Sequence, residues 1–479
     1  EAYVYTGMTT GPYFAPKNIG YATLEEALAK AQEFVDKNVT ILKDVTLAET
    51  LTIEAGKEII LDLKGNDINV ANDQVNFNIN GKLTLNDETG EGVFTSRNHF
   101  VNAGAEFIVN GGTVQNVATA TGGFPITLNG GSVTINGGTV QAVNNANYAI
   151  GGNGGTLVIN GGTVKGNWGA VNLQSGNATI KDGTLEVTGT TGGHALYVAG
   201  NTEVTIEGGE FKPYNGAVAS YALVLDEGNP TVNVSGGMFH KVWGCVIVYA
   251  GDLSLTGGTF GSNMVITNND PSESADINTF CAEGFGAKKI TDNEWQVLPM
   301  QTTQLNAGWN WFSAYVETDL ASLQSALVEN LECEEEENCN IAIKDHYIGT
   351  ITYLPQTGSW YGNNLTSFEH EKMYMIQTPT NMNLQIVGEV VNPEEHQITI
   401  VQNWNMIGYV LDYGMNLEDA LESIEPVNGD YIKSQHGYAE YYEGIGWYGP
   451  LTSMEPGHGY KFLSKGSDNR TLKYPTTRS

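Results

Sequence analysis

The chain has 479 residues, too many for one ordinary hydrophobic core, so its length predicts roughly two to four domains. Asp and Glu number 54 against 22 Lys and Arg, a net charge of −32 that makes nucleic acids and anionic membranes poor partners. No apolar run approaches the roughly 20 residues of a membrane-spanning helix, and the 59 glycines, well above the usual share of about 7%, indicate many turns rather than many helices.

The first predicted element is a helix over residues 21–36. Thr23 followed by Glu26 is a capping-box pattern, which marks a helix start. One apolar face then recurs at helical spacing, through Leu24, Ala27, Leu28, Ala31 and Phe34/Val35.

From Phe107 a phrase ending in Asn-Gly-Gly-Thr-Val recurs, with full copies starting at Phe107, Val133 and Leu157 and four degenerate copies after them. Successive copies lie 21 to 28 residues apart, which suits one coil of a parallel β-solenoid. We take the second glycine of each copy as a reference, at Gly112, Gly138, Gly162, Gly183, Gly209, Gly237 and Gly258.

Equivalent positions of a solenoid stack on one another, so each column should face one way. The column two residues after the reference glycine is apolar and should point inward: Val114, Val140, Val164, Leu185, Phe211, Phe239 and Phe260. The next column is polar in six of its seven members and should face solvent: Gln115, Gln141, Lys165, Glu186, Lys212, His240 and Gly261.

Asn110, Asn136 and Asn160 precede the glycine pairs, and we expect them to stack as a structural amide ladder rather than to bind a ligand. Strand-like runs place the start of the solenoid near Val39. Open solenoid ends expose apolar core, so they need caps. The helix of residues 21–36 should cover the first coil, and short strands over Ile277 to Val297 should cover the last.

Three phrases resemble those of pectate-lyase-like right-handed β-helix proteins, in particular the adhesin-like surface proteins of bacteria. They are Tyr21-Ala-Thr-Leu-Glu-Glu-Ala, Leu61-Asp-Leu-Lys-Gly-Asn-Asp-Ile and Ala282-Glu-Gly-Phe, together with the Gly-Gly-Thr coils. The resemblance covers residues 20–298 and implies a mostly β fold, a right-handed parallel β-helix with an N-terminal capping helix.

A second repeat follows the solenoid domain of residues 1–300. Gly308-Trp-Asn-Trp-Phe312 matches Asn403-Trp-Asn-Met-Ile407, and Trp360-Tyr-Gly362 matches Trp447-Tyr-Gly449, in the same order. We therefore predict two small β-rich (α+β) modules, 301–392 and 393–479. Each should have one short helix, marked by Leu320, Leu323 and Leu327 in the first and by Leu417, Ala420, Leu421 and Ile424 in the second.

The modules resemble C-terminal repeats of secreted and surface proteins of Gram-negative gut bacteria, a resemblance that implies no enzymatic activity. Their repeated tryptophans could serve as sugar platforms, but packing within the modules is the favoured interpretation: Trp309, Trp360, Trp404 and Trp447.

The cysteines fit no zinc-binding pattern. Cys333 and Cys339 flank four glutamates and could form a disulfide loop or stay as two thiols, whereas Cys245 and Cys281 are expected to be small buried hydrophobes. The glutamate run at 334–337 is interpreted as a solvated surface, with calcium as the alternative. No other metal or cofactor is expected.

Lyases of the resembling family use a calcium-binding carboxylate cluster and a basic residue, usually arginine. The coils from Gly112 onward have no arginine, and Arg97, beside Asn98 and His99, has no aspartate cluster in its repeat. The paired aspartates of hydrolases are also missing from the coils. Gly457-His458-Gly459 resembles a hydrolase phrase but is interpreted as a turn, so no catalytic residue is assigned.

The column six residues after the reference glycine contains Trp168, Asn215 and Trp243. The two tryptophans lie three coils apart, about 14 Å at one strand spacing per coil. With Asn215 between them and Tyr197, Tyr214 and His194 as neighbours, they could hold a neutral glycan. The alternative is that one or both tryptophans pack under a loop.

These patterns favour a non-catalytic, adhesin-like protein, a monomer that binds a glycan or a host or cell-surface protein through its solenoid face. A polysaccharide lyase or glycoside hydrolase with a divergent site is one alternative, and a structural stalk or spacer is another. The expected location is extracytoplasmic: secreted, at the cell surface or associated with an outer membrane. No signal-peptide pattern is present at Glu1-Ala2-Tyr3, and removal of such a peptide is one of two explanations for this.

Overall fold

The computed structural model describes residues 2–6, 17–33, 38–117, 123–143, 147–190, 192–216, 219–267, 273–331, 339–362 and 364–476, with side chains from residue 20 onward. Strands make up 51% of the chain and helices 7%, which confirms the mostly β class. The chain divides into two compact units, residues 1–282 with 289–297, and residues 283–288 with 298–479.

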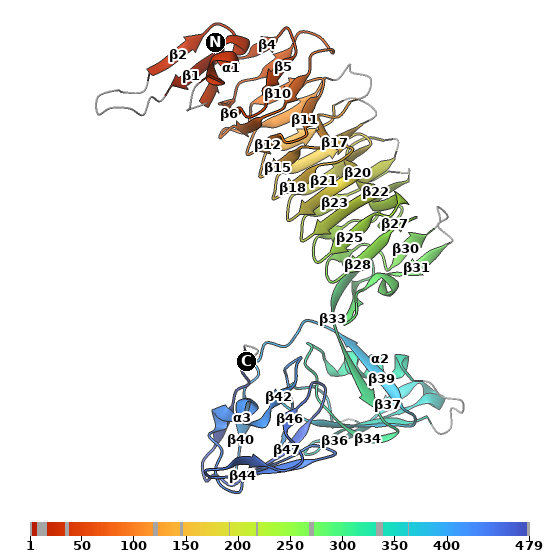
Figure 1. The fold of residues 1–479 in the computed structure, drawn as a ribbon. Helices are drawn as coiled ribbons and strands as arrows, with labels where there is room; N and C mark the ends of the chain where they lie inside the picture. Colours follow the sequence, from red (N-terminus) through yellow and green to blue (C-terminus); the bar gives the residue numbers. More distant parts are fainter. Residues whose placement is uncertain are drawn as a thin grey trace. The chain divides into compact units, whose positions relative to one another are not determined.

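The first unit is a parallel β-solenoid of about nine turns over residues 38–260 (Figure 1). Each full coil contributes one strand to each of three parallel sheets. Two long strands, β20 (Gly169–Ile180) and β22 (Gly193–Ile206), bend at the corner and serve sheets 2 and 1 in turn.

Sheet 1 contains, besides parts of β20 and β22, the strands β3 (Asn38–Ile41), β6 (Glu58–Asp62), β9 (Lys82–Asn86), β12 (Glu106–Val109), β15 (Ser132–Ile135), β18 (Thr156–Ile159), β25 (Thr231–Val234) and β28 (Asp252–Leu255). Sheet 2 contains, besides parts of β20 and β22, β5 (Leu51–Ile53), β8 (Phe77–Ile79), β11 (His99–Asn102), β14 (Ile126–Asn129), β17 (Tyr148–Gly152), β24 (Ser220–Gly228), β27 (Val246–Val248) and β30 (Met264–Thr267). Sheet 3 contains β4 (Val45–Leu47), β7 (Ile68–Val70), β10 (Val93–Ser96), β13 (Thr113–Asn116), β16 (Thr139–Gln141), β19 (Thr163–Gly166), β21 (Thr184–Val187), β23 (Glu210–Lys212), β26 (Met238–Phe239) and β29 (Thr259–Phe260).

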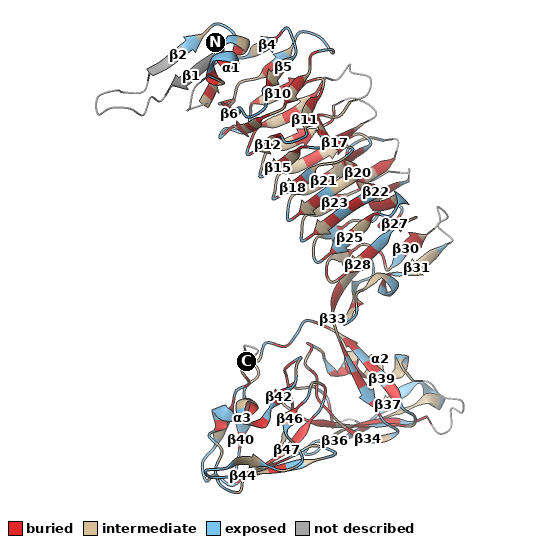
Figure 2. Ribbon diagram, viewed as in Figure 1, coloured by how far each residue is buried: buried red, intermediate tan, exposed pale blue. Residues whose placement is uncertain are grey.

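The predicted inward column is confirmed in sheet 3. All seven residues from Val114 to Phe260 are fully buried, and those in neighbouring coils are strand partners. The phenylalanines form a continuous stack, with ring centroids of Phe211 and Phe239 4.5 Å apart and those of Phe239 and Phe260 4.8 Å apart. Buried residues recur along the solenoid strands in Figure 2. The core of this unit is therefore a ladder of like residues.

The next column lies on the outer side of sheet 3, partly exposed as expected. The alternating charges in it do not simply pair with each other. Lys212 bonds instead to Glu210, two residues earlier on the same strand, at 2.6 Å, and His240 contacts the same carboxylate at 2.8 Å. The bond to Lys212 is the main cause that lowers the pKa of Glu210.

The reference glycines turn the chain into sheet 3, and all seven have φ between 74° and 102°. Residues with a Cβ rarely adopt this backbone region. A Cβ on Gly138 would also lie 2.4 Å from the carbonyl oxygen of Gly112 in the preceding coil. Both constraints explain why the column is glycine.

The amide ladder is confirmed and is one residue longer than the sequence predicted. The Nδ2 atoms of Asn110, Asn136 and Asn160 donate to the Oδ1 atoms of Asn86, Asn110 and Asn136, each at 2.8 Å. Each amide is thus engaged with its neighbours along the stack.

The capping helix α1 (Leu24–Ala31) has the predicted start, because Thr23 Oγ1 accepts a hydrogen bond from the Glu26 amide at 3.2 Å. Its apolar face is buried against the first coil. Gln32, at the end of the helix, hydrogen-bonds to the backbone of β5 (Leu51–Ile53) and the residue after it. Its Nε2 donates to the Thr52 carbonyl, and its Oε1 accepts the Glu54 amide. Strands β1 (Ala2–Thr6) and β2 (Lys17–Tyr21) extend this end by antiparallel pairing of β1 with both β2 and β3. The expected contribution of Phe34 and Val35 lies outside the described residues.

The last coil is covered by antiparallel strands, as predicted. Strand β31 (Ser274–Asp276) pairs with β30, and the start of β33 (Glu294–Leu305) pairs with β29, while β32 (Phe285–Thr291) continues this sheet. The segment Ile277–Phe280 is a 3₁₀ turn (η1) rather than a strand, because Asp276 caps it by accepting the Asn278 amide.

The second unit contains two five-stranded antiparallel sheets with equivalent strand orders. The first has the order β34 (Gly308–Phe312), β38 (Tyr374–Thr378), β35 (Ile341–Asp345), β36 (Gly349–Leu354), β37 (Ser359–Tyr361). The second has the order β41 (Asn403–Ile407), β47 (Tyr460–Ser464), β43 (Tyr431–Lys433), β44 (Tyr438–Tyr442), β45 (Gly446–Tyr448).

The predicted helices are α2 (Leu320–Glu329), and α3 (Leu417–Ala420) with the 3₁₀ turn η4 (Glu422–Ile424). The remaining elements are the pairs β33 with β39 (Met382–Val387), β40 (Ile398–Ile400) with β48 (Arg470–Leu472) and β42 (Met415–Asn416) with β46 (Ser453–Met454), and the turn η3 (Pro355–Thr357).

Equivalent asparagines make the same hydrogen bonds at the start of each module. Asn310 Nδ2 donates to the carbonyls of Asn306 and Ile376, and Asn405 Nδ2 donates to those of Val401 and Phe462, with matching distances of 2.7 and 2.8 Å to the first carbonyl and 3.3 Å to the second. The duplication seen in the sequence therefore extends to the buried hydrogen bonds.

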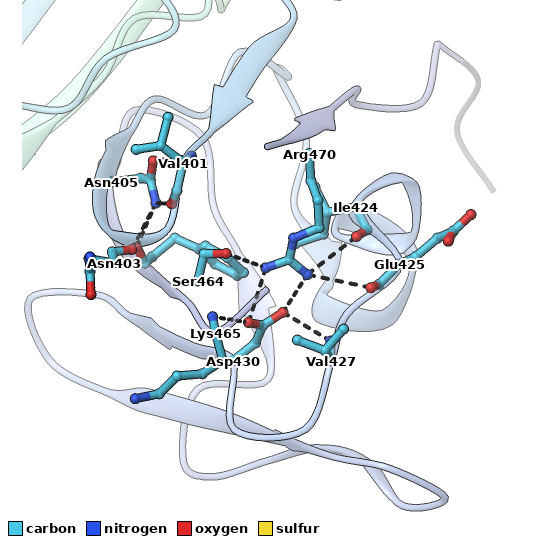
Figure 3. Close-up of polar contacts among 11 residues, drawn as sticks. Val401, Asn403, Asn405, Ile424, Glu425, Val427, Asp430, Ser464, Lys465 and Arg470 are labelled. Carbon is cyan, nitrogen blue, oxygen red and sulfur yellow. Dashed lines mark hydrogen bonds and ion pairs between the residues drawn. The ribbon is translucent and has the colours of Figure 1, made fainter. Parts of the chain in front are cut away.

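The second module also has a buried ion pair (Figure 3). Arg470 binds both oxygens of the fully buried Asp430, at 2.7 and 3.0 Å, and donates to Ser464 Oγ at 2.6 Å. Asp430 also accepts the amides of Val427 and Lys465. The pair joins β48 to the loop before β43.

The four cysteines differ in state. Cys245 and Cys281 are free thiols, and only Cys245 is fully buried, so the expectation of burial is confirmed for Cys245 and only in part for Cys281. Cys339 is disulfide-bonded. Cys333 and the glutamates at 334–337, with the alternative of calcium there, lie outside the described residues.

Candidate functional site

The outer surface of sheet 2 is aromatic in the later coils. Tyr148, His194 and Tyr221 occupy one column of neighbouring strands, with Gly169 between the first two. Tyr197 lies in a parallel column three residues further along β22. The ring centroids of His194 and Tyr197 and of His194 and Tyr221 are each 5.8 Å apart.

Gly169 makes room for the first of these rings. A Cβ at position 169 would lie 2.2 Å from the Tyr148 ring, so the ring lies directly over the glycine. Tyr148 is largely buried as a result and forms the floor of the aromatic surface.

These rings line an open pocket of about 400 Å³. Its lining consists of Tyr148, Trp168, Asn172, Gln174, Gly192, Gly193, His194, Tyr197 and Ala219. The Tyr148 ring centroid is 6.5 Å from that of Trp168 and 6.4 Å from that of Tyr197. Asn172 and Gln174 project outward from β20 and add amide groups.

The pocket carries no net charge in its lining. Burial lowers the pKa of His194 to about 4, so its imidazole is neutral at pH 7. Tyr197 Oη donates to Asp226 Oδ2 at 2.8 Å, and burial, followed by this bond, raises the pKa of Tyr197 above its usual value. The pocket therefore offers aromatic faces, amides and hydroxyls to an uncharged ligand.

Of the four residues predicted as a site, the structure brings Trp168 and Tyr197 together. Asn215 is exposed and lines a different pocket. Trp243 lines neither of these two pockets. Trp168 and Trp243 are exposed to 51% and 53%, so neither side chain is buried.

The pocket that contains Asn215 has a volume of about 530 Å³ and a charged lining. It includes Lys212, His240, Lys241 and Glu186 besides Tyr214. Because Glu210 already pairs with Lys212 and His240, much of this charge is neutralised within the protein. It is a weaker match to a neutral glycan than the aromatic pocket.

Four residues at or beside the pocket were not predicted from the sequence: Tyr148, Asn172, Gln174 and Asp226. Tyr148 lies ten residues after its reference glycine, Gly138, so it falls outside the column six residues after that glycine. The signal that could have located it is Gly169, whose missing side chain leaves space for a large ring one coil away.

The module tryptophans are packed to different extents. Trp360 and Trp447 pack against the cores of their modules, as expected. Trp309 and Trp404 are each 41% exposed, so the packing prediction holds for them only in part. Their exposed edges lie at equivalent positions of β34 and β41.

The residues considered for a lyase are engaged in the solenoid itself. His99 is fully buried among phenylalanines, with its ring centroid 4.4 Å from that of Phe94, and its Nδ1 lies 2.7 Å from the Pro125 carbonyl oxygen. Arg97 donates to Gln74 Oε1 at 2.7 Å. Gly457 lies in a turn, as expected, whereas His458 forms an isolated bridge with Phe312.

Within the described part of the chain, no helix is both long enough and apolar enough to cross a membrane. The sequence matches no protein-family model, and comparison with curated proteins gave no match either.

Proposed function

We propose that the protein is a non-catalytic, adhesin-like protein that binds a neutral glycan in the aromatic pocket of sheet 2. The observation that carries the proposal is the lining of this pocket, in which Tyr148, Trp168 and Tyr197 stand beside the amides of Asn172 and Gln174. Sugar rings present apolar C–H faces that pack on aromatic rings, and their hydroxyls pair with amides.

Size and charge support the same ligand class. A volume of about 400 Å³ is within the usual range of small-ligand sites of roughly 300–1,000 Å³. The lining holds no ionised side chain, and the overall charge of −32 disfavours acidic polysaccharides. An uncharged sugar is therefore a better match than the acidic substrates of the lyases that this fold resembles.

An extracytoplasmic location is part of the proposal. Disulfides persist in oxidising compartments, and Cys339 is disulfide-bonded. A rigid solenoid stabilised by repeated ladders suits display of a binding surface outside the cell.

The test is binding of the full chain to an array of neutral and acidic glycans, followed by incubation with each bound glycan. We expect binding to neutral glycans and no new reducing or unsaturated ends. Cleavage products would contradict the non-catalytic function. Absence of binding to all glycans, combined with capture of a cell-surface protein, would instead support the protein-ligand alternative.

A further inference from the structure

Three side chains of types that can bind a metal converge in the second unit. Glu317, His370 and His396 each offer one ligand atom, and these atoms lie within 4.8 Å of one another. His396 Nε2 is 3.5 Å from Glu317 Oε1, and His370 Nε2 is 3.9 Å from Glu317 Oε2. Ligands of a tetrahedral zinc ion bound at about 2.0–2.1 Å lie about 3.3 Å apart, so a small inward movement would complete the site.

The three ligands come from separate segments that the fold holds in place. Glu317 follows β34, and its amide donates to the Glu389 carbonyl at 2.7 Å. His370 lies in the turn before β38 and is buried. His396 lies between β39 and β40, in the segment that leads into the second module.

A second carboxylate orients one of the imidazoles. Glu371 Oε1 lies 2.9 Å from His396 Nδ1 and accepts a hydrogen bond from it. In the neutral imidazole this leaves Nε2 with a lone pair that faces Glu317. A carboxylate behind a ligating histidine is the usual arrangement at zinc sites.

The buried His370 is suited to the same role. Its Nε2 lies 3.9 Å from Glu317 Oε2, and a neutral imidazole can bind a metal through this atom. Its Nε2 lies 3.1 Å from the Val316 carbonyl oxygen and 3.4 Å from the Thr318 amide. Metal binding would replace the contact with Val316.

The repeat shows that the module scaffold does not require this cluster. At the positions equivalent to Glu317 and His370, by the offsets of 95 and 86 residues that relate the neighbouring strands, the second module has Asp412 and Pro456. It keeps the same sheet without an imidazole there. The histidine is therefore specific to the first copy.

We propose that Glu317, His370 and His396 bind one Zn²⁺ ion, with water as the remaining ligand and Glu371 as a positioning residue. Two imidazoles and one carboxylate form a ligand set typical of zinc. The ion would tie the first module to the segment that enters the second module.

The test is titration of the full chain with Zn²⁺ by calorimetry after metal removal with EDTA, with Ca²⁺ as a separate arm. We expect one Zn²⁺ per chain and no Ca²⁺ at this site, because imidazole nitrogen is a poor calcium ligand. His396→Gln and Glu317→Gln should each raise the Kd for Zn²⁺ at least tenfold, and Glu371→Gln should raise it about 10- to 100-fold. His436→Gln, which changes an exposed histidine outside the cluster, should leave the Kd unchanged.

His396 and Glu317 are preferred to the buried His370 because their replacement disturbs the core less. Circular dichroism of the metal-free variants, identical to that of the wild type, establishes that they fold. The proposal is overturned if the wild-type chain binds no Zn²⁺, or if its affinity is the same in the folded His396→Gln and Glu317→Gln variants.

Discussion

Phe312 pairs with His458 in an isolated antiparallel bridge, and Ile407 pairs with Lys372 in the same way. Phe312 and Ile407 are equivalent positions of the two modules, and so are Lys372 and His458. Superposition of one module on the other therefore maps each bridge onto the other bridge.

Neighbouring hydrogen bonds repeat the relationship. The Ser313 amide donates to the Gly457 carbonyl at 3.2 Å, and the Gly408 amide donates to the Glu371 carbonyl at 2.8 Å. These donors and acceptors are again equivalent in the repeat. The modules thus pack through the same patch on each, as the subunits of a two-fold symmetric dimer do.

The shared interface predicts that residues 298–479 fold as one cooperative unit without the solenoid. This fragment keeps the pairing of Met300–Leu305 in β33 with β39. We expect a single thermal transition by circular dichroism, and a lower melting temperature for either module expressed alone. Absence of a cooperative transition in the fragment would refute the prediction.

The phenylalanine stack of sheet 3 gives a second prediction. Phe239 is fully buried between Phe211 and Phe260, so Phe239→Ala should lower the unfolding free energy by about 3–5 kcal/mol through the cavity it leaves. The control is Lys212→Ala, which removes a partly exposed ion pair with Glu210 and should cost less than about 1 kcal/mol. Denaturant unfolding measures both, and equal effects would contradict the register.

The sequence was sufficient to predict the solenoid because each coil repeats the same constraints. A glycine with positive φ, an inward apolar residue and an amide ladder recur at fixed offsets. A position that is ambiguous in one coil can therefore be assigned from its equivalents in the others. The second unit was predictable for a similar reason, since alignment of its two copies identifies the equivalent strands. The turn at Ile277–Phe280 occurs only once and was missed.

The candidate site was predicted only in part because it depends on irregular loops. Trp168, Asn215 and Trp243 were grouped by their shared offset from the reference glycine, with Tyr197 as a neighbour, but only Trp168 and Tyr197 line one pocket. The zinc cluster has no local sequence pattern at all. Glu317, His370 and His396 are 53 and 26 residues apart, and only tertiary packing brings them together.

The ion pair of Figure 3 supplies a third prediction. Arg470→Met should lower the stability of the second module by about 3–5 kcal/mol, because it leaves the fully buried Asp430 carboxylate without its charged partner. Replacing both residues, as Asp430→Asn with Arg470→Met, should cost less than the single change. Denaturant unfolding of the three variants is the measurement. A double variant less stable than Arg470→Met would contradict this prediction. It would show that the hydrogen bonds from the Val427 and Lys465 amides to the carboxylate stabilise the module more than the unpaired charge destabilises it.

Acid should destabilise the solenoid through His99. Burial lowers its pKa in the folded state to about 4, whereas the unfolded value is about 6.5. Between these values the unfolded chain binds a proton that the folded chain does not, so stability falls as the pH is lowered from 6.5 to 4. One histidine contributes up to about 1.4 kcal/mol per pH unit.

His99→Phe should reduce this pH dependence, because a phenyl ring fits among the surrounding phenylalanines and does not titrate. The Pro125 carbonyl keeps its bond from the residue 99 amide at 3.0 Å. The melting temperature of the solenoid is measured at pH 7 and pH 5, with the exposed His346→Phe as control. An unchanged difference between the two pH values in His99→Phe would rule out this residue as the source.

The last prediction separates the two exposed tryptophans of the solenoid. Trp168 lines the aromatic pocket, 6.5 Å from the Tyr148 ring, whereas Trp243 has almost the same exposure and lies outside it. Trp168→Ala should weaken binding of a neutral glycan at least tenfold, since removal of an aromatic anchor from an interface commonly costs about 1–2 kcal/mol or more. Trp243→Ala is the matched control and should change the affinity less than twofold.

The double variant should then equal Trp168→Ala, because residues that share no ligand act independently. If Trp243→Ala also weakens binding, and the double variant loses more than the two single variants together, the glycan extends across the coils between them and the site is larger than the pocket.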